Sequence, residues 1–155
     1  MIKKIVHAIS TAGGIGYLPV APGTWAALAT TLIWYYLKSY TQLLNSGSIE
    51  LTIILVITIA GIITSDLSAR DWGKDPSKVV IDEVAGMSIA LLWITPNIRY
   101  YVAGLILFRF FDILKPLGIK KMEKMKGGIG IMSDDVLAGI YSLIVLRLVI
   151  MTGRF

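Results

Sequence analysis

The sequence of 155 residues contains no cysteine and only one histidine, His7. The absence of cysteine excludes a disulfide framework, thiolate zinc sites and every cysteine nucleophile. A single histidine excludes a metal site built from several histidines. Charged residues are also scarce, since they make up 16% of the chain, against about 25% in ordinary soluble domains.

Hydrophobic residues are abundant instead. Hydrophobic residues make up 55% of the chain without its 15 glycines, and the mean hydropathy is +0.74. This composition excludes disorder and favours a membrane protein. The net charge of +5 is compatible with nucleic acid or an anionic membrane, and the high hydropathy favours the membrane. No nucleic-acid partner is expected, and the absence of repeats and linkers predicts one domain over residues 1–155.

Five apolar stretches predict the fold: residues 25–44, 51–65, 84–95, 98–114 and 136–151. A spanning helix needs about 20 apolar residues, a length that only the first stretch reaches. We expect an all-α, multi-pass membrane bundle of about five apolar helices with the motifs in cytoplasmic loops. A compact soluble bundle with very apolar core helices is the alternative.

If all five stretches cross, most lysines fall on one side of the membrane. Lys3, Lys4, Lys115 and Lys120 lie on this side, whereas Lys38 lies near the other. The positive-inside rule makes the lysine-rich side cytoplasmic. The first nine residues place their apolar side chains at helical spacing, which is typical of an amphipathic helix rather than a signal peptide.

Most acidic residues fall into three groups, which the five-crossing topology places near the cytoplasmic face. Asp82-Glu83 interrupts an apolar run, where ionisable side chains are costly and indicate a functional site. Capping of the next helix is the structural alternative for this pair. For Asp66, Asp71 and Asp75, a surface or capping role is favoured over a functional one.

Asp134-Asp135 opens the last apolar stretch. Ser133 is therefore expected to cap a helix whose first turn holds both aspartates. Residues 127–132 are expected to form a flexible, glycine-rich loop. This loop lacks the lysine and hydroxyl of a P-loop, so nucleotide hydrolysis by that route is not expected. Helices that bring such carboxylates together need a positive partner, and oxygen ligands favour magnesium.

Arg109, Asp112 and Lys115 are spaced three residues apart, so they share one helix face that ends before Pro116. They can form an internal ladder of ion pairs. Alternatively, Asp112 binds a metal while Arg109 and Lys115 neutralise a phosphate. Thr24, in a rigid Pro-Gly-Thr segment, is expected to cap a helix whose N-terminus can accept that phosphate.

Together these segments resemble the phosphatidylglycerophosphatase A family. The resemblance covers four motifs in the family's order: residues 16–25, 80–86, 108–116 and 128–139. Where that family commonly has Gly-Ser after Gly-Thr-Trp, this chain has Ala26-Ala27, which affects a helix-packing detail more than the chemistry.

The resemblance implies a magnesium-dependent enzyme of a bacterial inner membrane that converts phosphatidylglycerophosphate to phosphatidylglycerol and phosphate. It implies an active centre formed by the carboxylates of the Asp82-Glu83, Asp112 and Asp134-Asp135 motifs. With no cysteine and one histidine, the nucleophile is expected to be a metal-activated water. An attacking Asp134 or Asp135 is the alternative.

Three other functions remain open from the sequence. A phosphatase of the same family can act on a different substrate. A transporter can use intramembrane carboxylates as an ion path, with Arg147 as counter-charge. A CDP-alcohol phosphotransferase is disfavoured, because the nearest match to its Asp-rich signature, residues 66–71, lacks the first glycine.

Overall fold

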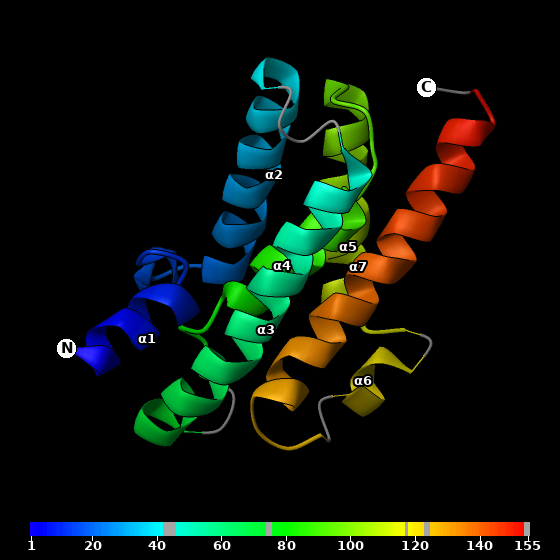
Figure 1. Ribbon diagram of the computed structural model, residues 1–155. Helices are drawn as coiled ribbons and strands as arrows, with labels where there is room; N and C mark the ends of the chain where they lie inside the picture. Colours follow the sequence, from blue (N-terminus) through cyan, green and yellow to red (C-terminus); the bar gives the residue numbers. More distant parts are fainter. Residues whose placement is uncertain (42–45, 74–75, 117, 123–124, 154–155) are drawn as a thin grey trace.

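The computed structural model describes residues 1–41, 46–73, 76–116, 118–122 and 125–153. Within these ranges the chain contains helices and no strand, which confirms the all-α prediction (Figure 1). The elements are α1 (Ile2–Ser10), the short 3-10 helix η1 (Ile15–Tyr17), α2 (Pro22–Tyr40), α3 (Gly47–Trp72), α4 (Ile81–Ala90), α5 (Ile98–Leu114), α6 (Ile119–Met122) and α7 (Gly127–Met151).

The helix bounds follow the apolar stretches with informative differences. The prediction for residues 98–114 is confirmed at both ends: Asn97 accepts a hydrogen bond from the backbone N–H of Arg99, and Lys115 ends α5 before Pro116. The stretch 84–95 was expected to be one helix, but α4 ends at Ala90 and a turn follows. The predicted end of the first stretch, residues 42–44, lies outside the described residues.

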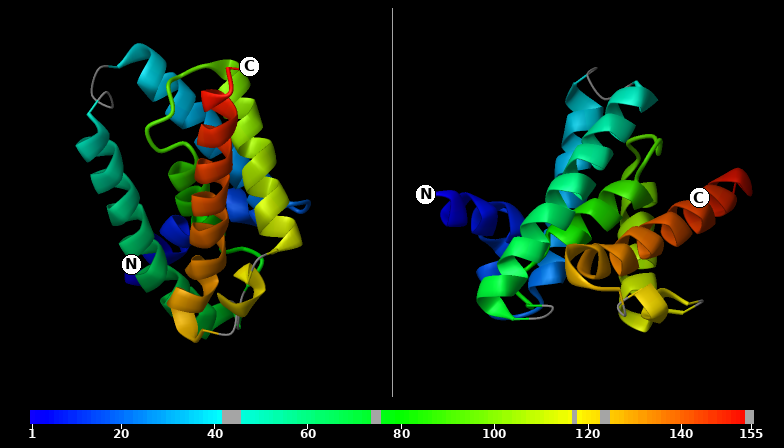
Figure 2. Two further views of the ribbon diagram at one scale, coloured as in Figure 1. Left: turned by 90° about the vertical axis from the view of Figure 1, so that its right-hand side faces the viewer. Right: turned by 60° about the horizontal axis from the view of Figure 1, so that its bottom comes forward.

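Helix α4 is the centre of the bundle (Figures 1 and 2). It contacts α2, α3, α5 and α7, and every residue from Ala85 to Ala90 is buried. Helices α2 and α4 begin at the end of the bundle where α3 and α5 finish and α7 starts; we call this the site end. The opposite end, with residues 91–97, is called the far end. The three motif segments predicted to share one side all lie at the site end.

Glycines set the close approach of α4 and α7. A Cβ atom on Gly86 would lie 2.4 Å from the carbonyl oxygen of Asp135, and one on Gly139 would lie 2.3 Å from the carbonyl oxygen of Gly86. Backbone atoms cannot rotate away as a side chain can, so both positions require glycine. This contact fixes α7 beside the first turns of α4.

We expect Gly139→Ala to destabilise the protein by about 1–3 kcal/mol, the usual cost of overpacking. Gly104→Ala is the matched control, because its Cβ would meet only side-chain methyl groups, the nearest at 3.0 Å. Thermal unfolding of both variants in detergent measures the difference. Equal melting temperatures would show that α4 and α7 separate easily.

The prediction of five spanning helices is wrong as a count. Among the described residues, only α3 is long and apolar enough to cross a membrane by length and composition. α4 has 10 residues, too few for a crossing, and α5 has 17, the lower limit of the range of about 17–25 for a spanning helix. Helix α7 interrupts its apolar sequence with Asp134, Asp135 and Arg147.

The outer surface is nevertheless apolar along four helices. Leu32 on α2, Val56 on α3, Ile106 on α5 and Leu148 on α7 are each more than half exposed, with further exposed apolar side chains on the same helices. Several polar side chains of these helices are buried instead, among them Thr30, Lys38, Glu50, Ser65 and Ser142. A large exposed apolar surface of this kind marks contact with lipid or with another protein.

A buried ion pair joins α2 to α3 at the far end. Lys38 Nζ lies 2.8 Å from Glu50 Oε2, and these side chains are 3% and 6% exposed. Lys38 also donates to the carbonyl oxygens of Leu91 and Ile94, while Glu50 accepts from the backbone N–H of Trp93. The pair therefore holds the turn after α4. The sequence placed Lys38 near the membrane surface and assigned Glu50 to no acidic group, so this pairing was not predicted.

Candidate functional site

A cavity of ≈ 680 Å³ opens at the site end. Its walls come from the start of α2, the segment before α4, the start of α4, the end of α5 and the first turns of α7. Seven of the predicted site residues line it: Asp82, Glu83, Arg109, Asp112, Lys115, Asp134 and Asp135. Residues from four sequence motifs thus meet in one place.

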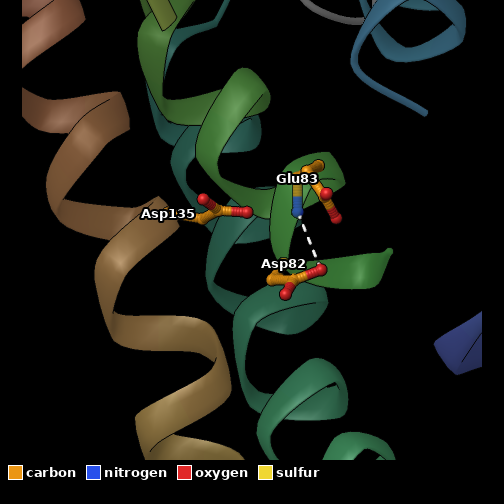
Figure 3. A group of neighbouring side chains, drawn as sticks. All are labelled: Asp82, Glu83 and Asp135. Atoms are coloured by element: carbon orange, nitrogen blue, oxygen red, sulfur yellow. Dashed lines mark hydrogen bonds between the residues drawn. The ribbon is translucent and has the colours of Figure 1, made fainter. Parts of the chain in front are cut away.

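Three carboxylates of the cavity lining lie close together (Figure 3). Asp82 and Glu83 lie in the first turn of α4, and Asp135 reaches toward them from α7. One oxygen atom from each lies within 4.8 Å of the others. Asp82 Oδ1 accepts a hydrogen bond from the backbone N–H of Glu83 at 3.1 Å, while Glu83 Oε2 is buried and has no hydrogen-bond partner among the described residues.

The remaining two carboxylates are paired with basic side chains. Asp112 Oδ2 lies 2.6 Å from Arg109 Nη1 within α5, and Asp134 Oδ2 lies 2.5 Å from Lys115 Nζ. Lys115 itself ends α5 with a left-handed φ of 45°, and its side chain lines the cavity. The ion-pair ladder considered for the Arg109 stripe is therefore present in part, with Lys115 paired across to α7.

The charges of the cavity do not balance. Among the described residues, five carboxylates line the cavity together with the cations Arg109, Lys115 and Lys120, which leaves two negative charges when all are ionised. Burial and the charge of Glu83 raise the pKa of Asp82 well above its usual range. Asp82, Glu83 and Asp135 make no ion pair with lysine or arginine in the described part of the chain. Three oxygen donors with two excess negative charges suit a hard divalent cation.

Thr24 is not the helix cap that the sequence predicted. Helix α2 begins at Pro22 after Ala21, so Thr24 lies inside its first turn and is exposed, outside the cavity lining. The motif reaches the cavity through Ala21, Pro22 and Gly23 instead. A Cβ atom on Gly23 would lie 1.8 Å from Glu83 Oε1, so a larger residue at this position would displace the Glu83 carboxylate.

The predicted loop before Asp134 is also wrong. Residues 127–132 are the first turns of α7, and Ser133 lies within the helix, where its hydroxyl donates to the carbonyl oxygen of Ile129. The glycines serve packing rather than flexibility, because a Cβ atom on Gly128 would lie 1.9 Å from the carbonyl oxygen of Ile62 in α3. Asp134 and Asp135 therefore lie well inside α7, at 8% and 3% exposure.

One further basic residue lines the cavity, and the described acidic residues expected to have surface roles lie outside its lining. Lys120 of α6 lines the cavity and was noted in the sequence only as a cytoplasmic charge. Asp66 pairs with Arg70, and Asp71 pairs with Lys3 and His7, in agreement with the surface role preferred for them. Asp75 lies outside the described residues.

Comparisons with known proteins agree on one family. Residues 8–150 match the family model described as phosphatidylglycerophosphatase A. Similar proteins include phosphatidylglycerophosphatase A of Haemophilus influenzae, 38% identical over 93% of this chain and 91% of its own length. Phosphatidylglycerophosphatase A of Escherichia coli is 35% identical over 88% of this chain and 78% of its own.

A third similar protein has a different name. A Bacteroides thetaiotaomicron protein, provisionally named a phosphatidylinositol-3-phosphatase, is 46% identical over 89% of each chain. No solved structure matches the chain.

Proposed function

Because the chain belongs to the phosphatidylglycerophosphatase A family of phosphatases, we propose that it removes the terminal phosphate of phosphatidylglycerophosphate, giving phosphatidylglycerol and phosphate. The observation that carries this proposal is the arrangement of charge in the cavity. Three carboxylates that form no ion pair with the described lysines and arginines lie beside a guanidinium and an ammonium group that are held at its wall. A phosphomonoesterase needs both kinds of group.

The basic side chains are suited to the phosphate. Arg109 presents a planar fork for two phosphate oxygens, and Lys115 supplies a point charge. Their partners Asp112 and Asp134 hold both side chains in place before substrate binds. The start of α2 adds the positive end of a helix at Pro22 and Gly23.

Asp82, Glu83 and Asp135 are proposed to hold a divalent cation, with magnesium preferred for an all-oxygen donor set. When bound, this ion supplies positive charge for the phosphate and lowers the pKa of a coordinated water. Asp112 and Asp134 remain within the cavity as further candidate ligands. Because Asp112 and Asp134 are already paired with Arg109 and Lys115, the other three carboxylates are favoured as metal ligands.

The nucleophile is proposed to be water. His7, the single histidine, lies in α1, where it pairs with Asp71 and does not line the cavity. A histidine nucleophile is therefore not available there. If rapid quench traps phosphate on a peptide that contains Asp134 and Asp135, the attacking group is an aspartate and not water.

The apolar surface supports a multi-pass membrane location. We propose that α2, α3, α5 and α7 cross the inner membrane around α4, whose ten residues end inside the bundle. Tyr17 and Trp25 are exposed at the site end, and Tyr36 and Tyr40 are exposed toward the far end, as in aromatic belts at two interfaces. The basic residues at the site end make it cytoplasmic by the positive-inside rule.

Phosphate release from purified protein tests the activity. Phosphatidylglycerophosphate should be hydrolysed with Mg²⁺ and not after chelation of divalent cations. Phosphatidylinositol 3-phosphate is the second substrate to compare, because of the name of the 46% identical relative. Preference for the inositol lipid would show that this family member acts on a substrate other than phosphatidylglycerophosphate. Phosphate release from neither lipid would overturn the proposal. The same assay separates a phosphatase from a transporter.

We expect Lys115→Met to raise KM for the lipid more than it lowers kcat, because the lysine neutralises phosphate charge on binding. Lys115→Arg should retain most of the affinity. Lys126→Met, at the start of α7 outside the cavity lining, is the control for a change in net charge. If Lys115→Met saturates with substrate as the unmodified protein does, Lys115 has a structural role, such as its ion pair with Asp134, and does not bind phosphate.

A further inference from the structure

Helix α1 carries an exposed apolar ridge. Ile2, Ile5 and Ile9 are 76%, 54% and 38% exposed. Successive residues of a helix diverge by about 100°, so these three side chains share one face, while Lys4 points away from it. Figure 2 shows α1 extending sideways from the bundle rather than along it.

The other face of α1 is fixed to the site end of α3. Lys3 Nζ lies 2.7 Å from Asp71 Oδ1, and His7 Nε2 lies 3.1 Å from Asp71 Oδ2. The His7 ring packs on Trp72 with centroids 4.0 Å apart. The hydroxyl groups of Ser10 and Ser68 also lie 2.8 Å apart in the interior. These contacts prevent α1 from rolling, so its isoleucines remain directed outward.

The surroundings of the ridge match a lipid surface with negative charge. The Lys3 side chain is 78% exposed even in its ion pair, and Lys4 is exposed beside it. Tyr17, Val20 and Trp25 add exposed apolar and aromatic surface at the same end of the bundle. Isoleucines flanked by lysines, with tyrosine and tryptophan nearby, form the pattern of a helix that lies in a membrane interface.

We propose that α1 lies in the headgroup layer of an anionic membrane and holds the opening of the cavity at headgroup depth. This inference rests on the proposed membrane location. The partner that we propose for the apolar ridge is the cytoplasmic leaflet of the membrane. Because Asp71 and Trp72 are the last two residues of α3, within two turns of its apolar stretch, the contacts of α1 link its depth to the end of that helix.

The absence of cysteine makes the test direct, since one introduced cysteine takes one label. Full-length Ile5→Cys is labelled with an environment-sensitive fluorophore and reconstituted into phosphatidylcholine vesicles with or without phosphatidylserine. Lys4→Cys is the matched control on the adjacent face. We expect blue-shifted emission and quenching by bilayer-embedded quenchers for the Ile5 label, more strongly with phosphatidylserine. The Lys4 label should stay in water.

Equal exposure of both labels to water-soluble quencher would overturn the proposal. A blue shift that depends on protein concentration and not on lipid would assign the ridge to a second copy of the chain. Ile2→Gln combined with Ile5→Gln should raise KM for substrate in vesicles severalfold without changing kcat. Phosphate release by the unmodified protein is measured separately, so failure of the proposed activity is distinguishable from failure of the anchor.

Discussion

Asp135→Asn should lower phosphate release by about 10³-fold, the scale on which a single buried electrostatic group contributes to catalysis, while the protein still folds. The side chain keeps its shape but loses its negative charge, and an NH₂ donor replaces one acceptor oxygen. Asp135 is 3% exposed and faces Asp82 and Glu83 without a basic partner among the described residues. Because the substitution removes one of three mutually repelling charges, the free energy of unfolding measured without metal should be unchanged or higher.

Thermal unfolding with and without Mg²⁺ separates loss of metal from loss of fold. A ligand that binds the folded state raises the melting temperature, so the unmodified protein should gain stability with Mg²⁺ and Asp135→Asn should gain much less. Asp82→Asn should behave in the same way. Asp66→Asn, at the same end but outside the cavity lining, is the control. Normal turnover by both Asp82→Asn and Asp135→Asn would refute the assigned site.

Glu50→Gln should destabilise the protein by about 3–5 kcal/mol, the cost of leaving one member of a buried ion pair alone. The amide can still accept the hydrogen bond from the backbone N–H of Trp93. It cannot neutralise Lys38, whose ammonium group is 2.8 Å away and enclosed. The loss is therefore one of charge compensation more than of packing.

The pair should behave as a unit. Lys38→Met alone should also be costly, and the double variant Lys38→Met with Glu50→Gln should cost less than the sum of the two. Arg70→Gln, which breaks an exposed pair with Asp66, should change stability by at most about 1 kcal/mol. Unfolding in detergent measures all four variants. An additive double variant would show that Lys38 and Glu50 do not depend on each other.

The lining of the site was largely predictable from the sequence. Asp82-Glu83 is conspicuous because charge interrupts an apolar run. The second signal is the spacing of Arg109, Asp112 and Lys115, which places them on one helical face. Both signals are local, and all seven predicted carboxylate and basic residues line the cavity, whereas Thr24 does not. The Thr24 prediction was wrong because a capping signal does not reveal that the helix already starts at Pro22.

Glycine was the residue type that local reasoning interpreted least well. Residues 127–132 suggested a loop, since glycine weakens an isolated helix. In the bundle, Gly128 allows α7 to meet the backbone of α3, and Gly139 allows it to meet α4. Contact between helices distant in sequence therefore outweighs intrinsic propensity, and it moves Asp134 and Asp135 from an expected first turn into the middle of a packed interface.

By itself, the sequence determined the helical class, the family and the residues able to carry the chemistry, because apolar periodicity and motif spacing are properties of the chain. Only the tertiary structure decided which charges neutralise one another. Lys115 pairs with Asp134, Lys38 pairs with Glu50, and Asp82, Glu83 and Asp135 are left together. The physical reason is that ion pairing depends on distances of a few ångströms between separate helices, which are set by packing around α4.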